Sequence, residues 1–204
     1  MSAGWQPLIA ALGGEPSFLA ELVERYAEPH RRYHGVAHID ALARLFEQVA
    51  AGPGWRRPAE VALAILFHDA IYEPGRPDNE ARSAQLARER LADWDQVEVE
   101  RIAALIEATA SHGAAQTEAD PDLGHFLDAD VAILGAPPEV YDRYARGVLE
   151  EYAPVVDVAA FRAGRRVFVL EQLARPQLFH TLWFRDHYEA TARENLGREL
   201  ASLS

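Results

Sequence analysis

The sequence contains no cysteine among its 204 residues. This absence excludes disulfide bonds, thiolate metal ligands and a cysteine nucleophile. Any metal ion must therefore be held by histidine, aspartate or glutamate side chains.

Basic residues are also scarce, because 20 Lys and Arg stand against 32 Asp and Glu, which gives a formal net charge of −12 at pH 7. We expect no extended nucleic-acid-binding surface, since phosphate backbones attract basic surfaces. A small anionic ligand can still bind to a local group of cations.

Long apolar runs are missing as well. The longest, Val61 to Phe67, is far too short to span a bilayer, and the first residues show no basic segment followed by an apolar one. We therefore expect a cytoplasmic protein with no membrane partner. The composition leaves the oligomeric state open, with a homodimer as one option.

Helical periodicity runs along the whole chain, and no segment alternates with the period of two that marks strands. Pro16, Pro58 and Pro138 stand where first-turn prolines are found. The predicted helices cover roughly residues 16–28, 36–51, 58–72, 79–93, 96–111, 122–134, 138–152, 157–174 and 187–202. We predict an all-α, single-domain helical bundle over residues 1–204, because 49% of the residues are apolar and no long linker interrupts them. The site is expected within about residues 30–135, with helices of about residues 138–203 packed on it.

The segment VALAILFHDAIY combines apolar and ionisable residues. Its seven successive apolar residues predict a helix that is buried on all sides and then presents His68 and Asp69. An unpaired charge in such a place costs several kcal/mol, so the pair needs partners. A divalent cation would supply one. Alternatively, the two side chains cap the helix or bond each other.

Two further histidines stand in the segment YHGVAHID. His34 and His38 are four residues apart and share one face of a helix that begins by His34. Gly35 leaves that beginning open, so His34 can instead lie at the helix entry and face the cleft. We take His38 as the metal ligand. The alternative is a pair of half-exposed surface histidines.

The third segment, HFLDADVAIL, carries two aspartates in an otherwise apolar helix. Asp128 and Asp130 fall about 200° apart around the helix axis, so only one can face the core. Leu127, Val131 and Leu134 share a stripe that includes Asp130 more closely, and we therefore predict Asp130 as the inward carboxylate.

The predicted set of His38, His68, Asp69 and Asp130 offers nitrogen and oxygen donors only. Such donors suit one divalent ion among Mn, Mg, Fe, Co, Ni and Zn, and the sequence does not choose among these metals.

The order of these residues resembles the HD superfamily of metal-dependent phosphohydrolases, which has an all-helical fold and is named for the His-Asp doublet. The strings YHGVAHID, FHDAIY, DNEARSA, IEATASH, FLDADVAILG and ARENLGREL are similar to those of small stand-alone bacterial members described only as predicted phosphohydrolases. The resemblance covers most of the chain and implies the same four metal ligands, with hydrolysis of a phosphate ester as the activity.

The sequence lacks two motifs that are found in some members of this superfamily. Many of its phosphodiesterases continue from the doublet into Ile-Gly-Lys, whereas this chain continues into Ala-Ile-Tyr and has no lysine there. Members with two metal ions carry two more histidines before the last aspartate. Here only His112 and His125 lie between residues 70 and 130, and we expect His125 to be a core or capping residue. The sequence thus favours one metal ion, although Glu80 or His112 could help to hold a second.

Roles follow from this interpretation. The metal would activate a water molecule that Asp69 or a nearby carboxylate positions. His34 and His112 are the candidate proton donors, since histidine titrates near neutrality, and Glu80 is a candidate contact to the water. For each of these residues there is also a structural alternative, such as a charged residue at a helix end that interacts favourably with the helix dipole. The candidate contacts to a small anionic substrate, for instance a nucleotide, are Asn79, Arg31, Arg82, Arg165 and Arg185.

Two other functions compete with hydrolysis of a phosphate ester. One is a di-iron oxygenase on the same scaffold, which requires two irons. The other is a regulatory module that binds a metal or a nucleotide without turnover.

Overall fold

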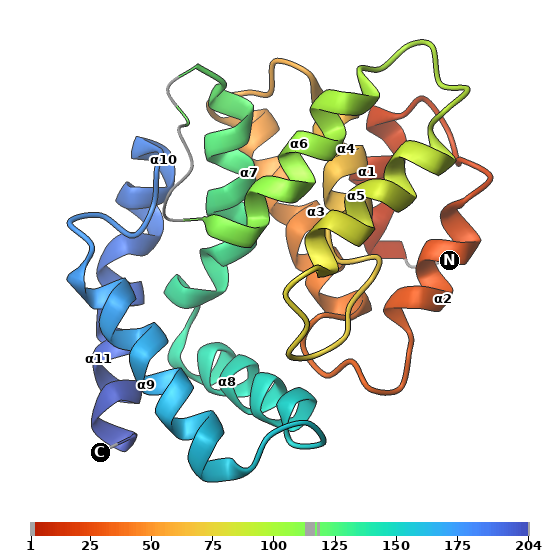
Figure 1. Cartoon of the computed structure of the whole chain (residues 1–204). Helices are drawn as coiled ribbons and strands as arrows, with labels where there is room; N and C mark the ends of the chain where they lie inside the picture. Colours follow the sequence, from red (N-terminus) through yellow and green to blue (C-terminus); the bar gives the residue numbers. More distant parts are fainter. Residues whose placement is uncertain (1–2, 113–116, 118, 204) are drawn as a thin grey trace.

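The computed structural model describes residues 3–112, 117 and 119–203. Every regular element within these residues is helical, which confirms the predicted all-α class (Figure 1). No helix in the described part of the chain combines the length and the apolar character that crossing a membrane requires.

In the part of the first half that the structure describes, there are six α-helices. A short 3-10 helix, Ala3–Trp5, leads into them. They are α1 (Gln6–Ala11), α2 (Leu19–Tyr26), α3 (Val36–Ala51), α4 (Pro58–Phe67), α5 (Asn79–Arg90) and α6 (Val99–Ala108).

The second half contains α7 (Pro121–Val131), α8 (Pro138–Tyr152), α9 (Val158–Ala174), α10 (Leu182–Phe184) and α11 (Ala190–Ser202). Short 3-10 turns follow α6 and α7 over Thr109–Ser111 and Ala132–Gly135. A π-helical segment, Arg185–Glu189, joins α10 to α11.

Several predicted boundaries are confirmed and others are wrong. The helices predicted over residues 36–51 and 138–152 match α3 and α8. Pro16 is not a first-turn proline, because its carbonyl oxygen accepts from the amide of Leu19 in a turn that precedes α2. Neither α1 nor α10 was predicted. The helix predicted to reach residue 72 ends at Phe67.

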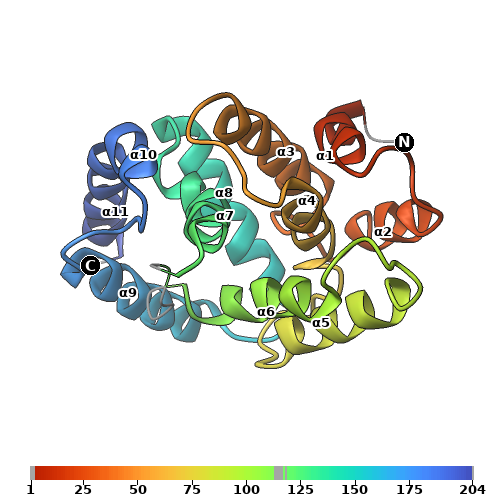
Figure 2. The same ribbon diagram turned by 90° about the horizontal axis from the view of Figure 1, so that it is seen from above.

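Helix α4 forms the centre of the first half. All its residues from Val61 to Phe67 are fully buried, and α1, α3, α5, α6 and α7 all pack on it (Figure 2). Complete burial of one large apolar side chain contributes about 1.5–3 kcal/mol, so this run anchors the helix in one position. The residues that follow it, His68 and Asp69, are thereby held at a fixed point inside the molecule.

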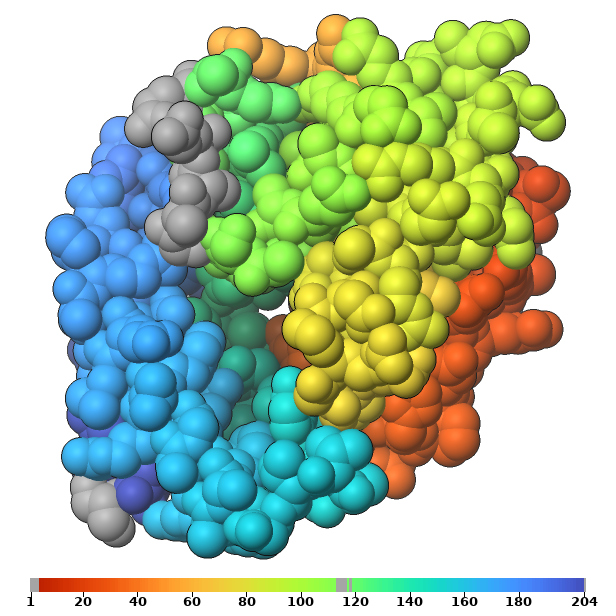
Figure 3. Space-filling view, in the orientation of Figure 1, coloured from red at the N-terminus to blue at the C-terminus, as the bar shows by residue number. Residues whose placement is uncertain are grey.

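The helices after α7 form the other side of the molecule. Helix α11 packs on α9 and on the 3-10 turn after α7, where the Asn195 amide donates to the carbonyl oxygens of Leu134 and Ala136. Figure 3 shows the surface hollowed between these helices and the first half. A cavity of about 310 Å³ lies there, with walls from both halves.

Candidate metal centre

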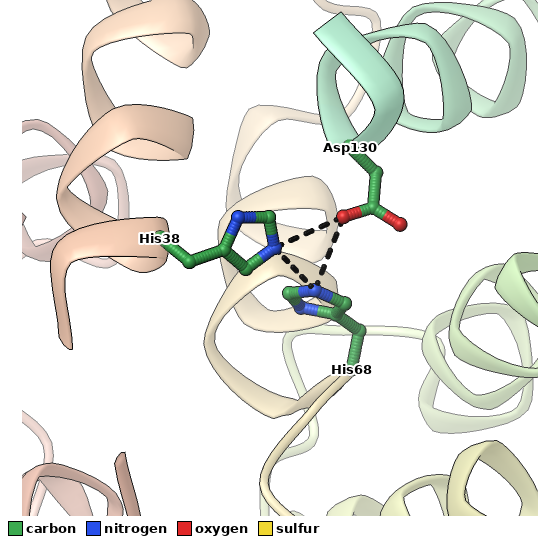
Figure 4. A group of neighbouring side chains, drawn as sticks. All are labelled: His38, His68 and Asp130. Atoms are coloured by element: carbon green, nitrogen blue, oxygen red, sulfur yellow. Dashed lines mark hydrogen bonds and ion pairs between the residues drawn. The ribbon is translucent and has the colours of Figure 1, made fainter. Parts of the chain in front are cut away.

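His38 and Asp130 line this cavity, and His68, which is buried and does not line it, meets both of them. His38 lies in the first turn of α3, His68 directly follows α4, and Asp130 lies near the end of α7. Figure 4 shows the three side chains pointing toward one another from these elements. His38 Nε2 is 3.2 Å from His68 Nε2 and 3.0 Å from Asp130 Oδ1, and His68 Nε2 is 3.4 Å from the same oxygen. Within the described residues, this is the one group of three or more potential ligands whose donor atoms lie within 4.8 Å of one another.

The backbone of α4 fixes the orientation of the His68 ring. Its Nδ1 donates to the carbonyl oxygen of Ile65 at 2.9 Å. Since that bond requires the proton on Nδ1, the neutral ring presents a lone pair at Nε2, toward His38 and Asp130. A hydrogen bond of this kind from the outer nitrogen is typical of histidines that bind metals.

The electrostatics of the group favour a positive charge at its centre. Burial disfavours the charged form of His68, yet Asp69 and Asp130 outweigh burial and raise the pKa of His68 well above its usual value. For Asp130, burial opposes ionisation, but His68, His112 and His38 hold its pKa well below the usual range. A divalent cation satisfies the same two carboxylates and frees both imidazole lone pairs for ligation, so the residues present fit a metal ion.

Asp130 and Asp128 have different partners, as the helical phase predicts. The second oxygen of Asp130 accepts from His112 Nε2 at 2.7 Å. Asp128 faces away and accepts from the amides of His180 and Thr181, at 2.6 and 2.7 Å, and from the Thr181 hydroxyl. Asp128 thus holds the segment that precedes α10.

Asp69 lies beside the three converging residues. Its Oδ2 is 3.1 Å from His68 Nε2 and 3.8 Å from His38 Nε2. The backbone of Asp69 is held from both sides, because its amide donates to the Tyr26 hydroxyl and its carbonyl oxygen accepts from Arg31. Burial raises the pKa of this carboxyl group, but the neighbouring His68 lowers it, and the resulting pKa lies below its usual value. Asp69 is therefore a fixed carboxylate at the wall of the cavity.

His34 lies at the helix entry and lines the cavity, and it is not part of the converging group. Its Nδ1 is 2.7 Å from Glu151 Oε2, a carboxylate of α8 that is 2% exposed. Burial opposes protonation of His34, but the hydrogen bond to Glu151 and the charges of Asp69 and Glu151 raise its pKa.

The other predicted site residues differ in whether they line the cavity and whether their polar atoms are already bound. Glu80, Asn79, His112 and Arg165 line the cavity. The side-chain amide of Asn79 is bound to the loop before α5. Its oxygen accepts from the backbone N–H of Glu73, and its nitrogen donates to the carbonyl oxygen of Glu73. His125, a core residue as predicted, is buried and its Nδ1 donates to the carbonyl oxygen of Pro121.

The four arginines predicted as substrate contacts also differ in their position relative to the cavity. Arg165 lines the cavity with its guanidinium between the rings of Tyr144 and Phe168, and Glu199 binds it through two hydrogen bonds. Arg31 is buried and supports the backbone after His68. Arg82 and Arg185 are not among the residues that line the cavity. Arg82 bonds Glu73 at the surface, and Arg185 bonds the carbonyl oxygen of Thr181.

The sequence interpretation missed Glu151 and the tyrosines of the cavity wall. A signal for Glu151 existed, because Tyr141, Tyr144 and Val148 mark the inner face of α8 and Glu151 continues it. The aromatic lining consists of Tyr33, Tyr72, Tyr144, Tyr152 and Phe168.

Comparison with known proteins gives no support from relatives: no family model matches the chain, and no curated protein or solved structure matches it. The geometry of the site and the order of its residues are therefore the basis for assigning a function.

Proposed function

We propose that this protein is a cytoplasmic, metal-dependent hydrolase of phosphate esters, with nucleotides among its candidate substrates, and that it belongs to the HD superfamily. One observation carries the proposal. His38 Nε2, His68 Nε2 and Asp130 Oδ1 converge beside a cavity that His38 and Asp130 line, and the His68 ring is held in the tautomer that a metal ligand requires.

The three residues, with Asp69 beside them, would hold one divalent cation. Two imidazole nitrogens and carboxylate oxygens suit Mn, Mg, Fe, Co, Ni or Zn. When bound, such an ion supplies Lewis-acid chemistry, lowering the pKa of water and polarising a phosphoryl oxygen.

The chain's own residues supply the proton chemistry. The Asp69 carboxylate accepts a hydrogen bond from the attacking water and orients it, because its backbone is fixed by Tyr26 and Arg31. His112 donates to the outer oxygen of Asp130 and keeps that carboxylate turned toward the two histidines. His34 and Glu80 also line the cavity.

The cavity suits a small anionic substrate. Its volume of about 310 Å³ is at the lower end of the range typical of ligand sites. Arg165 is a buried cation that lines the cavity, and its hydrogen bonds to Glu199 and to the Tyr144 hydroxyl occupy three of the five N–H groups of the guanidinium, which leaves two for a ligand.

The positions of the remaining histidines favour hydrolysis over oxygenase chemistry. A di-iron oxygenase would need a second set of imidazole ligands. His125 is buried beside Trp55 and Phe184 with its Nδ1 bonded to a backbone oxygen, and His112 bonds an oxygen of Asp130.

Activity assays test the proposal directly. The purified protein is stripped of metal with a chelator, reloaded with each divalent ion in turn, and assayed against nucleoside mono-, di- and triphosphates and simple phosphomonoesters. We expect hydrolysis that disappears on chelation, returns with one of the ions, and falls at least 100-fold in Asp130→Ala. The control is Asp142→Ala, which removes a surface ion pair with Arg198. Metal binding without hydrolysis of any phosphoester would contradict the proposal and favour the regulatory module.

A further inference from the structure

Glu151 joins α8 to the loop that precedes α3. One carboxylate oxygen, Oε1, accepts from three consecutive backbone amides, those of Arg32, Tyr33 and His34, at 2.7, 2.7 and 2.9 Å. The other oxygen, Oε2, accepts from His34 Nδ1 at 2.7 Å and from the Tyr72 hydroxyl at 3.0 Å. Five donors from two separate segments thus bind one buried carboxylate.

The packing around Glu151 brings the loop close to α8. Gly147 lies one turn earlier on the same face, and a Cβ there would lie 3.3 Å from the Tyr33 Cβ and 3.5 Å from the Arg32 backbone. A larger side chain at this position would push the loop away from the helix. Gly147 provides the space and Glu151 the hydrogen bonds, so the position of the loop relative to α8 is specified by both.

The His34 ring is oriented by these contacts. It stacks on the Tyr72 ring at 4.3 Å between centroids and meets the Tyr33 ring edge-on at 4.8 Å. Because Glu151 accepts a hydrogen bond from Nδ1, Nε2 is the nitrogen left for a ligand in the cavity that His34 lines. A phosphoryl oxygen only accepts hydrogen bonds, so His34 binds it as the imidazolium, with a proton on Nε2 as well as on Nδ1. The Glu151 carboxylate stabilises this charged form of the ring. The ring centroid is 6.2 Å from that of His38. A phosphate-sized anion at the metal centre can therefore reach His34.

We propose that Glu151 is a positioning residue that holds His34 as a direct contact to the phosphoryl oxygens of the substrate. The inference rests on the proposed function for the identity of the anion. The second half of the chain, through α8, would thus set the position of an anion-binding group on the first half. His34 would bind a non-bridging oxygen, and Glu151 would act only through His34.

Binding of inorganic phosphate to the metal-loaded protein, measured by calorimetry, tests this without requiring turnover. The variants are His34→Gln, Glu151→Gln and the double variant. Loss of one charge-assisted hydrogen bond weakens binding about tenfold. We expect each single variant to raise the Kd for phosphate about tenfold and the double variant to be no weaker than His34→Gln. Glu150→Gln is the matched control. The Glu150 side chain is 61% exposed, and its ion pair with Arg32 is long, at 3.9 Å.

The outcomes separate the two claims. If Glu151→Gln weakens phosphate binding equally in the presence and in the absence of His34, or leaves the wild-type Kd unchanged, the positioning role is wrong. If the phosphate results are as expected but no phosphoester is hydrolysed, the proposed function fails and the positioning role stands.

A measurement on the wild-type chain covers the case in which Glu151→Gln does not fold. The protein is labelled with ¹⁵N-histidine, and the His34 signals are assigned by their loss in His34→Gln. We expect a protonated Nδ1 with a slowly exchanging, downfield proton. A His34 ring protonated at Nε2 alone would overturn the inference.

Discussion

His68 and Ile65 are joined by a hydrogen bond within the last turn of α4, in which the imidazole Nδ1 donates to the carbonyl oxygen at 2.9 Å. The bond matters because it aims the opposite nitrogen at His38 and Asp130. One ligand of the candidate metal centre is thus pre-oriented by a helix whose position is set by complete burial.

A comparison of two buried histidines tests this orientation. His125 also donates Nδ1 to a backbone oxygen of its own helix, but its ring lies against Trp55 and Phe184. We expect His68→Ala to lower metal affinity at least 100-fold and His125→Ala to leave it within about threefold of wild type, as only the first removes a ligand. Titration with Mn²⁺ followed by calorimetry measures both. Equal losses in the two variants would show that metal binding responds to general destabilisation.

The two aspartates of α7 should separate stability from metal binding. Asp128→Ala leaves three donors of residues 180 and 181 without their acceptor, and we expect a loss of about 3 kcal/mol in the free energy of unfolding, with metal retained. Asp130→Ala should abolish metal binding. In the metal-free protein Asp130→Ala should also cost stability, because His38, His68 and His112 lose the carboxylate that they share, so metal binding is the effect that distinguishes the two variants. Urea unfolding with and without a chelator measures these effects, and a reversed pattern would contradict the assignment.

The sequence predicted this division because helical phase is a local property. Two residues on one helix differ in direction by a fixed angle, so the apolar stripe through Leu127 and Val131 was enough to choose Asp130. The buried run in α4 likewise predicted where His68 and Asp69 would stand. Both inferences needed only neighbouring residues and the regular geometry of a helix.

The role of Glu151 could not be predicted in the same way. Its partners, Arg32, Tyr33, His34 and Tyr72, are up to 119 residues away in the chain. Phase places Glu151 on the inner face of α8, but the sequence does not say which loop meets that face. Helix α1 was missed for a related reason, since its six residues are too few to show a period and Leu8 and Ile9 form it by packing in the core.

The pair of Glu151 and His34 should give stability a specific pH dependence. Burial opposes ionisation of Glu151, but its bonds to His34 and to backbone amides lower its pKa from 4.5 to about 2. A lowered carboxyl pKa stabilises the fold above pH 4.5, and this contribution is lost as the pH falls through about 2. The pKa of His34 is raised above 6.5, so its contribution is present below pH 6.5 and is lost at higher pH.

The two contributions overlap between pH 4.5 and 6.5. In metal-free protein, we expect Glu151→Gln to be less stable than wild type by up to about 3 kcal/mol in this window. The difference should shrink toward pH 2 and decline again above the pKa of His34. Urea unfolding at a series of pH values measures it, with Glu150→Gln as the control. A difference that is constant with pH would contradict the ion pair.

Arg165 and Arg82 should respond differently to removal. Arg165 is 8% exposed and neutralises Glu199, a carboxylate whose side chain is only 10% exposed. We expect Arg165→Ala to cost about 3–5 kcal/mol, because it leaves a buried charge unpaired. Arg82→Ala removes a surface ion pair with Glu73, and we expect a change of no more than about 0.5 kcal/mol. Thermal and urea unfolding measure both, and similar costs would contradict the described burial of Arg165.

The most direct measurement of the central claim is the metal content of the purified protein together with a titration of its metal-free form. The site predicts one divalent ion per chain in the wild type, a rise in the midpoint of thermal unfolding when that ion is added back, and neither effect in Asp130→Ala. Asp142→Ala, at the surface, should behave as the wild type does. A wild-type protein that takes up no divalent ion, or that takes one up equally well after Asp130→Ala, would contradict the metal centre on which the account rests.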